Sequence, residues 1–336
     1  MLFITRITGK NIINQYIEEM KKFFFILITF LFTSTLLADQ KLGRFFEDQP
    51  DVNDDHQIHF IYLLSKDAQD REWDINGKIE NLVLFINEKM IKATTNNRKN
   101  KELNGPAKKY KYDYNKEGKV DITFMRVNKT SKDLKKGEGG PMGHFDEILF
   151  SKNFKNPKKN YFIFAELNNG ANQGDAGVGI GTVYVKGLPD EKIKLLTAHE
   201  LIHTQGGVYN CVKGANNAHY TTDGKHMAQF GFNLNKNLYI HKIKGCPQLI
   251  DSVFLTPTSD DPYDPYEIAC LYNIGKYTNK KFLKILKNKV KARDKNKRYK
   301  SQPRFGSDCR WRDYSKDNEG FFLVGSNVNQ LDKLGN

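Results

Sequence analysis

The sequence predicts an α+β fold in which a mixed β-sheet carries two main helices. Segments rich in β-forming residues alternate with segments of helical periodicity, in the order strand, helix, three strands, helix. A hydrophobic content of 39% and an aromatic content of 12% are sufficient for a buried core. Long periodic runs become rare after residue 207, so an irregular part is expected to follow the sheet.

Four segments are expected to form strands because aromatic, β-branched and other apolar residues dominate them. They are residues 57–65, 120–127, 161–167 and 179–186. The first helix is expected over residues 74–95, where apolar side chains recur on one broad face. Charged and glycine-rich stretches at residues 96–118 and 129–143 are expected to be surface loops.

The second helix is expected to begin near Asp190. Pro189 and Asp190 can start it, and Glu191 is favourable at the positive end of the helix dipole. Gly206 and Gly207 can end it.

The glycines at residues 174–181 lead into a strand rather than a helix. This order excludes a dinucleotide-binding fingerprint, which places the pyrophosphate at a helix N-terminus. A glycine-rich bulge or a close-approach strand beside a substrate groove is the more natural interpretation.

Residues 1–38 have the layout of a secretory signal peptide. A basic start at Met20 is followed by the apolar run 23–32 and by a short cleavage region that ends at Ala38. The apolar run is shorter than the roughly 20 residues that span a bilayer, which disfavours a retained anchor. We therefore expect a secreted or periplasmic protein whose true start is Met20.

All four cysteines lie in the second half of the chain: Cys211, Cys246, Cys270 and Cys309. An even number in an exported protein predicts two disulfides, with three possible connectivities. We expect a catalytic domain over residues 39–270 and a basic, disulfide-tied C-terminal extension over residues 271–336.

The segment His199-Glu200-Leu201-Ile202-His203 is a complete H-E-x-x-H motif on the second predicted helix. Residues four apart share a helix face, so both imidazoles can bind one zinc ion at about 2.0–2.1 Å. Glu200 can accept a proton from the water that the metal acidifies. The motif therefore predicts a zinc-dependent hydrolase with Glu200 as its catalytic base.

Residues 197–230 resemble the active-site region of zincin metallopeptidases, and more narrowly the metzincin clan. Gly206 matches the glycine that follows the second histidine by three residues in that clan, and Met227 is the candidate for its methionine turn. The resemblance implies a metzincin-like catalytic domain, bound zinc and peptidase activity.

The chain departs from the metzincin pattern at the third metal ligand. Tyr209 stands where the clan has His or Asp, and a phenol with a pKa of about 10 is a poor zinc ligand. His219 and Asp223 are the candidates, and His219 is favoured because histidine is the commoner ligand. Asp223 could instead orient an imidazole, and His226 is a further candidate.

The leading hypothesis is a monomeric, secreted zinc peptidase that hydrolyses peptide bonds. Its peptide substrate would lie along an exposed sheet edge to which residues 177–186 contribute. A zinc amidase acting on cell-wall peptides is the first alternative. A catalytically inactive secreted binding module is the second, and Tyr209 keeps it open.

The formal net charge is +14, and residues 276–300 contain twelve basic residues and one acidic residue. Such a segment can make weak contact with an anionic envelope surface, or it can be a solvated lysine-rich helix face. No nucleic-acid partner is expected, because aromatic-interleaved readout motifs are missing.

Overall fold

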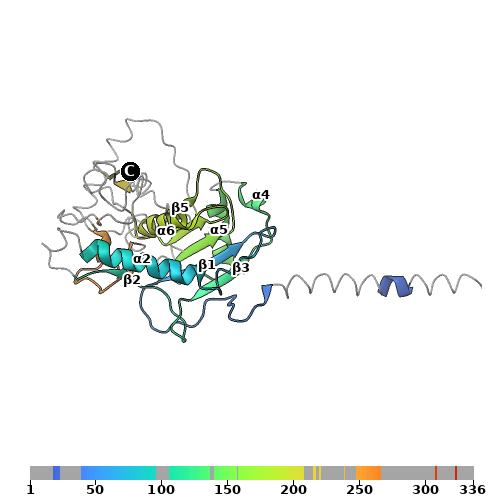
Figure 1. The fold of residues 1–336 in the computed structure, drawn as a ribbon, viewed down its shortest axis with the longest axis horizontal. Helices are drawn as coiled ribbons and strands as arrows, with labels where there is room; N and C mark the ends of the chain where they lie inside the picture. The colour runs from blue at the N-terminus through green and yellow to red at the C-terminus, as the bar shows by residue number, and fades with distance from the viewer. Residues whose placement is uncertain are drawn as a thin grey trace, which may run out of the picture. The chain divides into compact units, whose positions relative to one another are not determined.

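The computed structural model describes residues 18–22, 39–95, 106–136, 140–156, 158–207, 215–216, 219–220, 238, 247–265, 307–308 and 322–323. The chain divides into two units, Met1–Arg44 and Phe45–Asn336, and the second unit contains the β-sheet (Figure 1). Among the described residues, no helix has the length and apolar character needed to cross a membrane.

A mixed five-stranded sheet in the order β3-β1-β4-β6-β5 forms the centre of the second unit (Figure 1). Its strands are β1 (Gln57–Leu64), β3 (Ile122–Arg126), β4 (Lys159–Ala165), β5 (Gly174–Gly177) and β6 (Ile180–Tyr184). The first four strands in the spatial order are parallel, whereas β5 runs antiparallel to β6 at the edge. The expected α+β class with a mixed sheet is confirmed.

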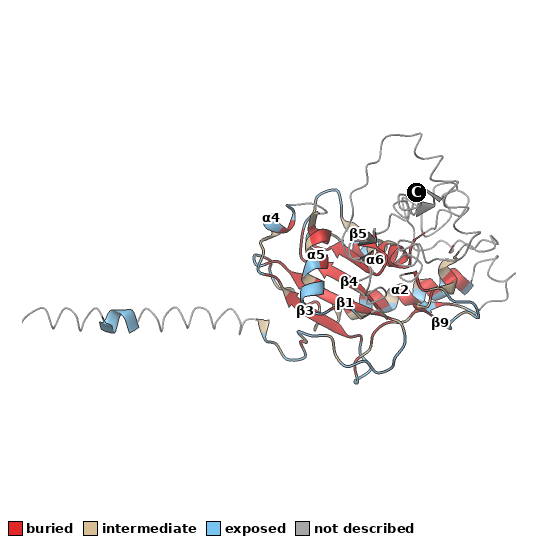
Figure 2. Cartoon of the chain, turned by 180° about the vertical axis from the view of Figure 1, so that it is seen from behind, coloured by how far each residue is buried: buried red, intermediate tan, exposed pale blue. Residues whose placement is uncertain are grey.

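Helices cover both faces of the sheet. They are α2 (Lys78–Thr95), α4 (Ser131–Leu134), α5 (Gly140–Ser151) and α6 (Asp190–Thr204). On β1, Phe60 and Tyr62 belong to the core that α2 and α6 share, whereas Ile61 and Leu63 belong to the core beneath α5. Figure 2 shows the central strands in the colour of buried residues. Burial on both faces explains why β1 is a nearly continuous apolar run.

The expectation of two main helices was wrong, because α5 is a third. Its first four residues were assigned to the surface loop 129–143. Met142, Phe145 and Leu149 form its buried face, at the i, i+3 and i+7 positions of a helix. Two consecutive glycines just before this pattern, at residues 139 and 140, concealed the start of the helix in the sequence.

Smaller differences affect other elements. Helix α2 begins at Lys78 rather than at residue 74, because residues 74–77 form a turn in which Gly77 has φ 81°. Short strands pair two by two outside the main sheet: β2 (Lys109–Tyr110) with β9 (Leu255–Thr256), β7 (Ala215–Asn216) with β8 (His219–Tyr220), and β10 (Ser307–Asp308) with β11 (Phe322–Leu323). A 3-10 helix, η1, covers Leu249–Asp251.

The expected bounds of α6 are confirmed. Pro189 is its N-cap residue, and the chain leaves the helix through Gly206 and Gly207 at φ 91° and 64°. The Gly207 N–H donates to the carbonyl of Ile202 at 3.0 Å, as in a Schellman ending. Two left-handed residues in succession explain why glycines stand here.

Several expectations lie outside the described residues. They concern most of the signal peptide, the four cysteines, and the basic segment 276–300. The boundary after residue 270 falls outside them too.

Candidate functional site

Helix α6 brings the two motif histidines together. The Nε2 atoms of His199 and His203 are 3.0 Å apart, and their rings are nearly perpendicular with centroids 4.6 Å apart. Two ligands of a tetrahedral zinc ion at 2.0–2.1 Å would be separated by about 3.3 Å. The imidazole pair therefore fits a shared zinc ion with little adjustment.

The packing of α6 on the sheet fixes the position of this pair. Leu201 and Ile202, between the two histidines, are buried in the core. At the end of the helix, Gly181 of β6 permits a close approach, because a Cβ there would lie 2.9 Å from side-chain atoms of Thr204 and Phe162. The helix thus lies closer to the sheet than a side chain at residue 181 would permit.

Glu200 is 6% exposed and its carboxylate lies against the edge strand β5. A Cβ added to Gly174 would lie 2.5 Å from Glu200 Oε1 and 3.0 Å from its Cδ. The carboxylate is therefore held between the helix and the backbone of β5.

This contact also corrects the expected substrate edge. Strand β6, which forms half of the segment 177–186, is an interior strand paired on both sides. The edge strand is β5, to which only Gly177 of that segment belongs.

The candidates for the third metal ligand follow α6 in the chain. His219 lies on β8, where its backbone pairs with Asn216 of β7 in an antiparallel ribbon that follows α6 in the chain. Asp223 and His226 lie outside the described residues, as do Tyr209 and Met227.

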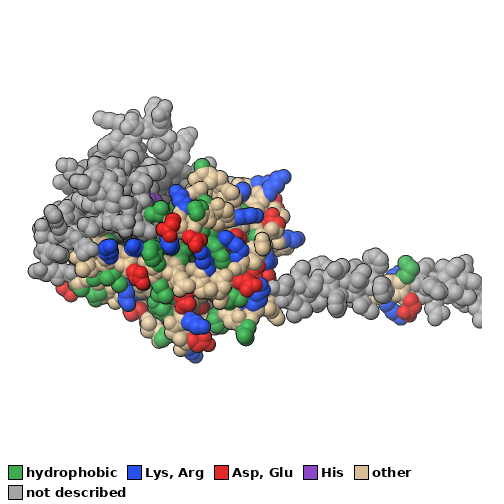
Figure 3. Space-filling view, viewed as in Figure 1, with side chains coloured by type: hydrophobic (Ala, Val, Ile, Leu, Met, Phe, Trp, Pro, Cys, Tyr) green, Lys and Arg blue, Asp and Glu red, His purple; other side chains and the backbone are tan. Residues whose placement is uncertain are grey.

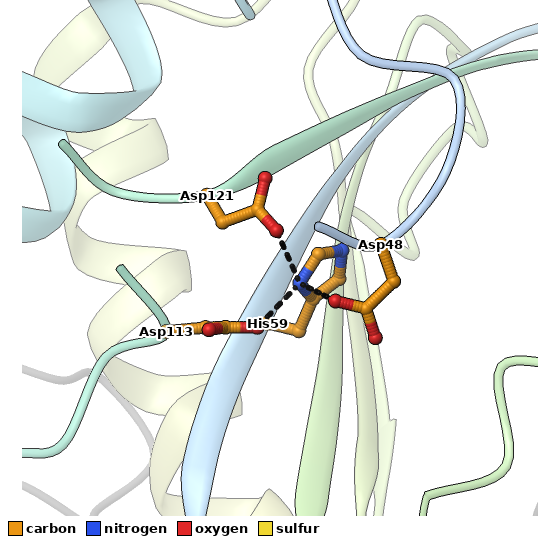
Figure 4. Close-up of side chains that lie close together, drawn as sticks. All are labelled: Asp48, His59, Asp113 and Asp121. Carbon is orange, nitrogen blue, oxygen red and sulfur yellow. Dashed lines mark hydrogen bonds and ion pairs between the residues drawn. The ribbon is translucent and has the colours of Figure 1, made fainter. Parts of the chain in front are cut away.

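A second group of polar side chains, which the sequence analysis missed, gathers around the buried His59 at the amino-terminal end of the parallel strands (Figure 4). We call it the His59 cluster, and its members are Asp48, Asp51, His59, Asp113, Asp121 and Lys159. Ligand-type atoms of four of these residues lie within 4.8 Å of one another, and such a donor set can hold a cation. The cation that the structure shows there is the Lys159 ammonium, whose Nζ is 2.6–2.7 Å from three carboxylate oxygens.

His59 lies beside Lys159 in this cluster and is fully buried. Its Nδ1 is 2.9 Å from Asp113 Oδ2, 3.4 Å from Asp48 Oδ1 and 3.8 Å from Asp121 Oδ2. Burial lowers the pKa of His59, but the hydrogen bond to Asp113 and the neighbouring carboxylates outweigh burial and raise it above its ordinary value.

The pKa values of two carboxylates in the cluster, Asp113 and Asp121, shift in opposite directions. Burial raises the pKa of Asp113, but its contacts with His59 and Lys159 outweigh this and lower the pKa. Burial raises the pKa of Asp121. The nearby His59 lowers it by less, so the pKa of Asp121 is raised overall.

The cluster is built from distant segments, so no local motif marks it. The sequence signal that could have found it is charge in buried strands, since His59 lies within β1 and Lys159 begins β4, and both strands are otherwise largely apolar.

No family model matches the chain, and no curated protein matches it. Solved structures of OgpA from Akkermansia muciniphila resemble it weakly. The catalytically inactive form, in complex with an O-glycopeptide (glycodrosocin) substrate, is 15% identical with a TM-score of 0.34, over 49% of this chain and 52% of OgpA. A wild-type crystal form is 16% identical with a TM-score of 0.33, over 49% and 52% of the two chains. The chain thus spans about half the length of OgpA, and at these TM-scores the likeness supports no conclusion about function.

Proposed function

We propose that the chain is a zinc-dependent peptidase whose metal is held by His199 and His203 and whose catalytic base is Glu200. The observation that carries this proposal is the 3.0 Å separation of the two Nε2 atoms on a helix that the core holds in place. A carboxylate from the same helix lies at the adjacent sheet edge.

Each residue has a distinct chemical task. A bound zinc ion would supply a Lewis acid and lower the pKa of a water molecule to about 7. His199 and His203 would hold it through Nε2 as neutral imidazoles. Glu200 would accept a proton on its carboxylate and return it to the nitrogen that leaves when the peptide bond breaks.

Strand β5 is the natural place for the substrate backbone. Among the strands that the structure describes, it pairs only with β6 and therefore forms one edge of the sheet. An extended peptide can add to such an edge through main-chain hydrogen bonds. Because Glu200 touches β5, a peptide bound there would pass the catalytic carboxylate.

The remaining assignments belong to the same proposal. His219 is the favoured third ligand and Asp223 the alternative. The layout of residues 1–38 supports export to the periplasm or beyond, where the four cysteines would form two disulfides.

The proposal is tested by digesting a peptide library with and without a chelator, at neutral pH. The library should include O-glycopeptides, because OgpA was solved with one, and cell-wall peptides, which detect the amidase alternative. We expect cleavage that the chelator stops and added zinc restores. Cleavage that is indifferent to the chelator would contradict the assignment.

Glu200→Gln tests the base itself. This variant should lose at least about a hundredfold in turnover and still bind zinc, because the amide cannot accept the proton. Glu191→Gln is the matched control on the same helix, where the carboxylate is exposed and pairs with Lys194. It should retain full activity.

A further inference from the structure

A short segment of the second unit lies against the outer edge of the sheet. We call residues 45–51 the strap. Phe45 forms a parallel bridge with Thr123 of β3, and its carbonyl accepts a hydrogen bond from the Phe124 N–H at 2.7 Å. The Gln49 N–H donates to Asp121 Oδ2 at 2.9 Å. The strap therefore covers part of the edge of β3.

The His59 cluster joins this strap to the sheet by charge. Lys159 Nζ contacts Asp48 and Asp51 of the strap and Asp113 beneath it, at 2.6–2.7 Å. Figure 4 shows Asp48 approaching the His59 imidazole from one side and Asp113 from the other. With every group ionised, the cluster has four negative and two positive charges. If His59 is neutral, a single positive charge, that of Lys159, faces the four carboxylates.

Titratable groups surround the imidazole on every neighbouring segment. They are Asp48 from the strap, Asp113 from the loop before β3, Asp121 at the start of β3, and Lys159 and Tyr161 from β4. Burial lowers the pKa of Lys159, but Asp113 and Asp48 outweigh it and raise the pKa, so the ammonium keeps its charge. His59 is the member of the cluster whose ordinary pKa is nearest to neutral pH.

His59 can change its charge without changing its contacts. Its Nδ1 faces three carboxylates, so it is the nitrogen expected to keep its proton when the ring is neutral. Its Nε2 is 2.9 Å from Thr123 Oγ1. A hydroxyl can accept a hydrogen bond from the charged ring or donate one to the neutral ring. Protonation therefore alters the attraction for the strap and leaves the geometry in place.

We propose that His59 is a proton-operated latch, which holds the strap on the sheet while its ring is charged and loosens the strap when the ring becomes neutral. The direction of the pH dependence follows from the pKa of His59, which is raised because the carboxylates outweigh the effect of burial. The stabilisation is present in full below about pH 6.5, the ordinary value, and is lost as pH rises through the raised folded-state pKa.

Loosening the strap would uncover the outer edge of β3. The Phe124 N–H would lose its acceptor on Phe45, and the Phe124 ring would lose the edge-to-face contact with Phe46 at 5.7 Å. The latch would keep this edge covered while His59 is charged.

Amide hydrogen exchange between pH 6 and pH 9 tests the latch. Protection factors, corrected for the intrinsic rate at each pH, should fall about tenfold for the Gln49 and Phe124 amides, the order expected for one charge-assisted hydrogen bond. The Ile61 and Phe162 amides in the centre of the sheet should keep their protection. Strap protection that is constant over this range would overturn the proposal.

Two variants assign the effect to His59. His59→Gln keeps a neutral donor and should make the protection of the Gln49 amide independent of pH. His144→Gln is the matched control, since His144 lies outside the cluster, beside Lys129, and should leave the pH dependence intact. If His59→Gln fails to fold, Asp48→Asn removes the strap carboxylate that faces the imidazole. This variant should likewise make the protection of the Gln49 amide independent of pH. The proposal would be overturned if the protection of the Gln49 amide kept its wild-type pH dependence in either cluster variant. It would also be overturned if that pH dependence disappeared in the His144 variant.

Discussion

The α6 site and the His59 cluster differ in how the chain builds them. The α6 site takes its two histidines and its glutamate from five consecutive residues of one helix, on the face of the sheet that α2 and α6 cover. The His59 cluster collects its members from separate segments and packs against Phe154 and Tyr161 on the opposite face. The cluster contains its own cation in Lys159, whereas the α6 site has the chemistry of a site that recruits one.

This difference gives the two regions different sensitivities. Removing a charge from the cluster leaves buried carboxylates without their counter-charge, so the expected loss is in folding stability. Changes at α6 that leave the packing intact are expected to affect catalysis rather than stability.

The largest expected effect is that of Lys159→Met. The variant removes the ammonium from Asp113, which is 1% exposed, and from the half-buried Asp48 and Asp51. The free energy of unfolding should fall by about 3–5 kcal/mol, the range for breaking a buried ion pair. Denaturant unfolding at neutral pH measures it.

Lys158→Met is the control at the neighbouring position. Lys158 pairs with Asp54, whose side chain is 93% exposed, so its loss should change the unfolding free energy by less than about 0.5 kcal/mol. Equal effects in the two variants would mean that the cluster does not hold the sheet and the strap together.

A smaller effect, confined to catalysis, is expected for Gly174→Ala. The new Cβ would meet Glu200 Oε1 at 2.5 Å and displace the carboxylate. Turnover should fall roughly 10- to 100-fold, because misplacing a catalytic group by about 1 Å costs that much. Steady-state kinetics and zinc analysis of the same sample separate this loss from loss of metal.

Gly181→Ala provides the contrast. Its Cβ would meet Phe162 and Thr204 rather than Glu200, so overpacking should lower stability by about 1–3 kcal/mol. Activity per folded molecule should change less than in the Gly174 variant. The reverse order of activity losses would contradict the placement of Glu200 against β5.

The contrast between local and distant residues also explains which features the sequence could predict. The core strands and α6 have local signals, namely apolar runs, a proline and acidic start, and paired glycines at the end. Helix α5 was missed in part because glycines precede its apolar pattern. The edge strand β5 was not counted among the four expected strands, because its four residues include two glycines and no large side chain.

The His59 cluster was missed for a different reason. Asp48, His59, Asp113 and Lys159 are brought together by strand order and by the strap, and neither can be deduced from local spacing. By contrast, the motif on α6 needed only the periodicity of a helix, so its histidines could be paired from the sequence.

The most direct measurement is the zinc content of the purified and zinc-reconstituted protein. About one zinc per chain is expected, and His199→Ala and His203→Ala should each lose it while the helical circular dichroism stays unchanged. His144→Ala, on α5, should keep the metal. A wild-type protein that binds no zinc, or histidine variants that bind it as well as the wild type, would contradict the proposed function.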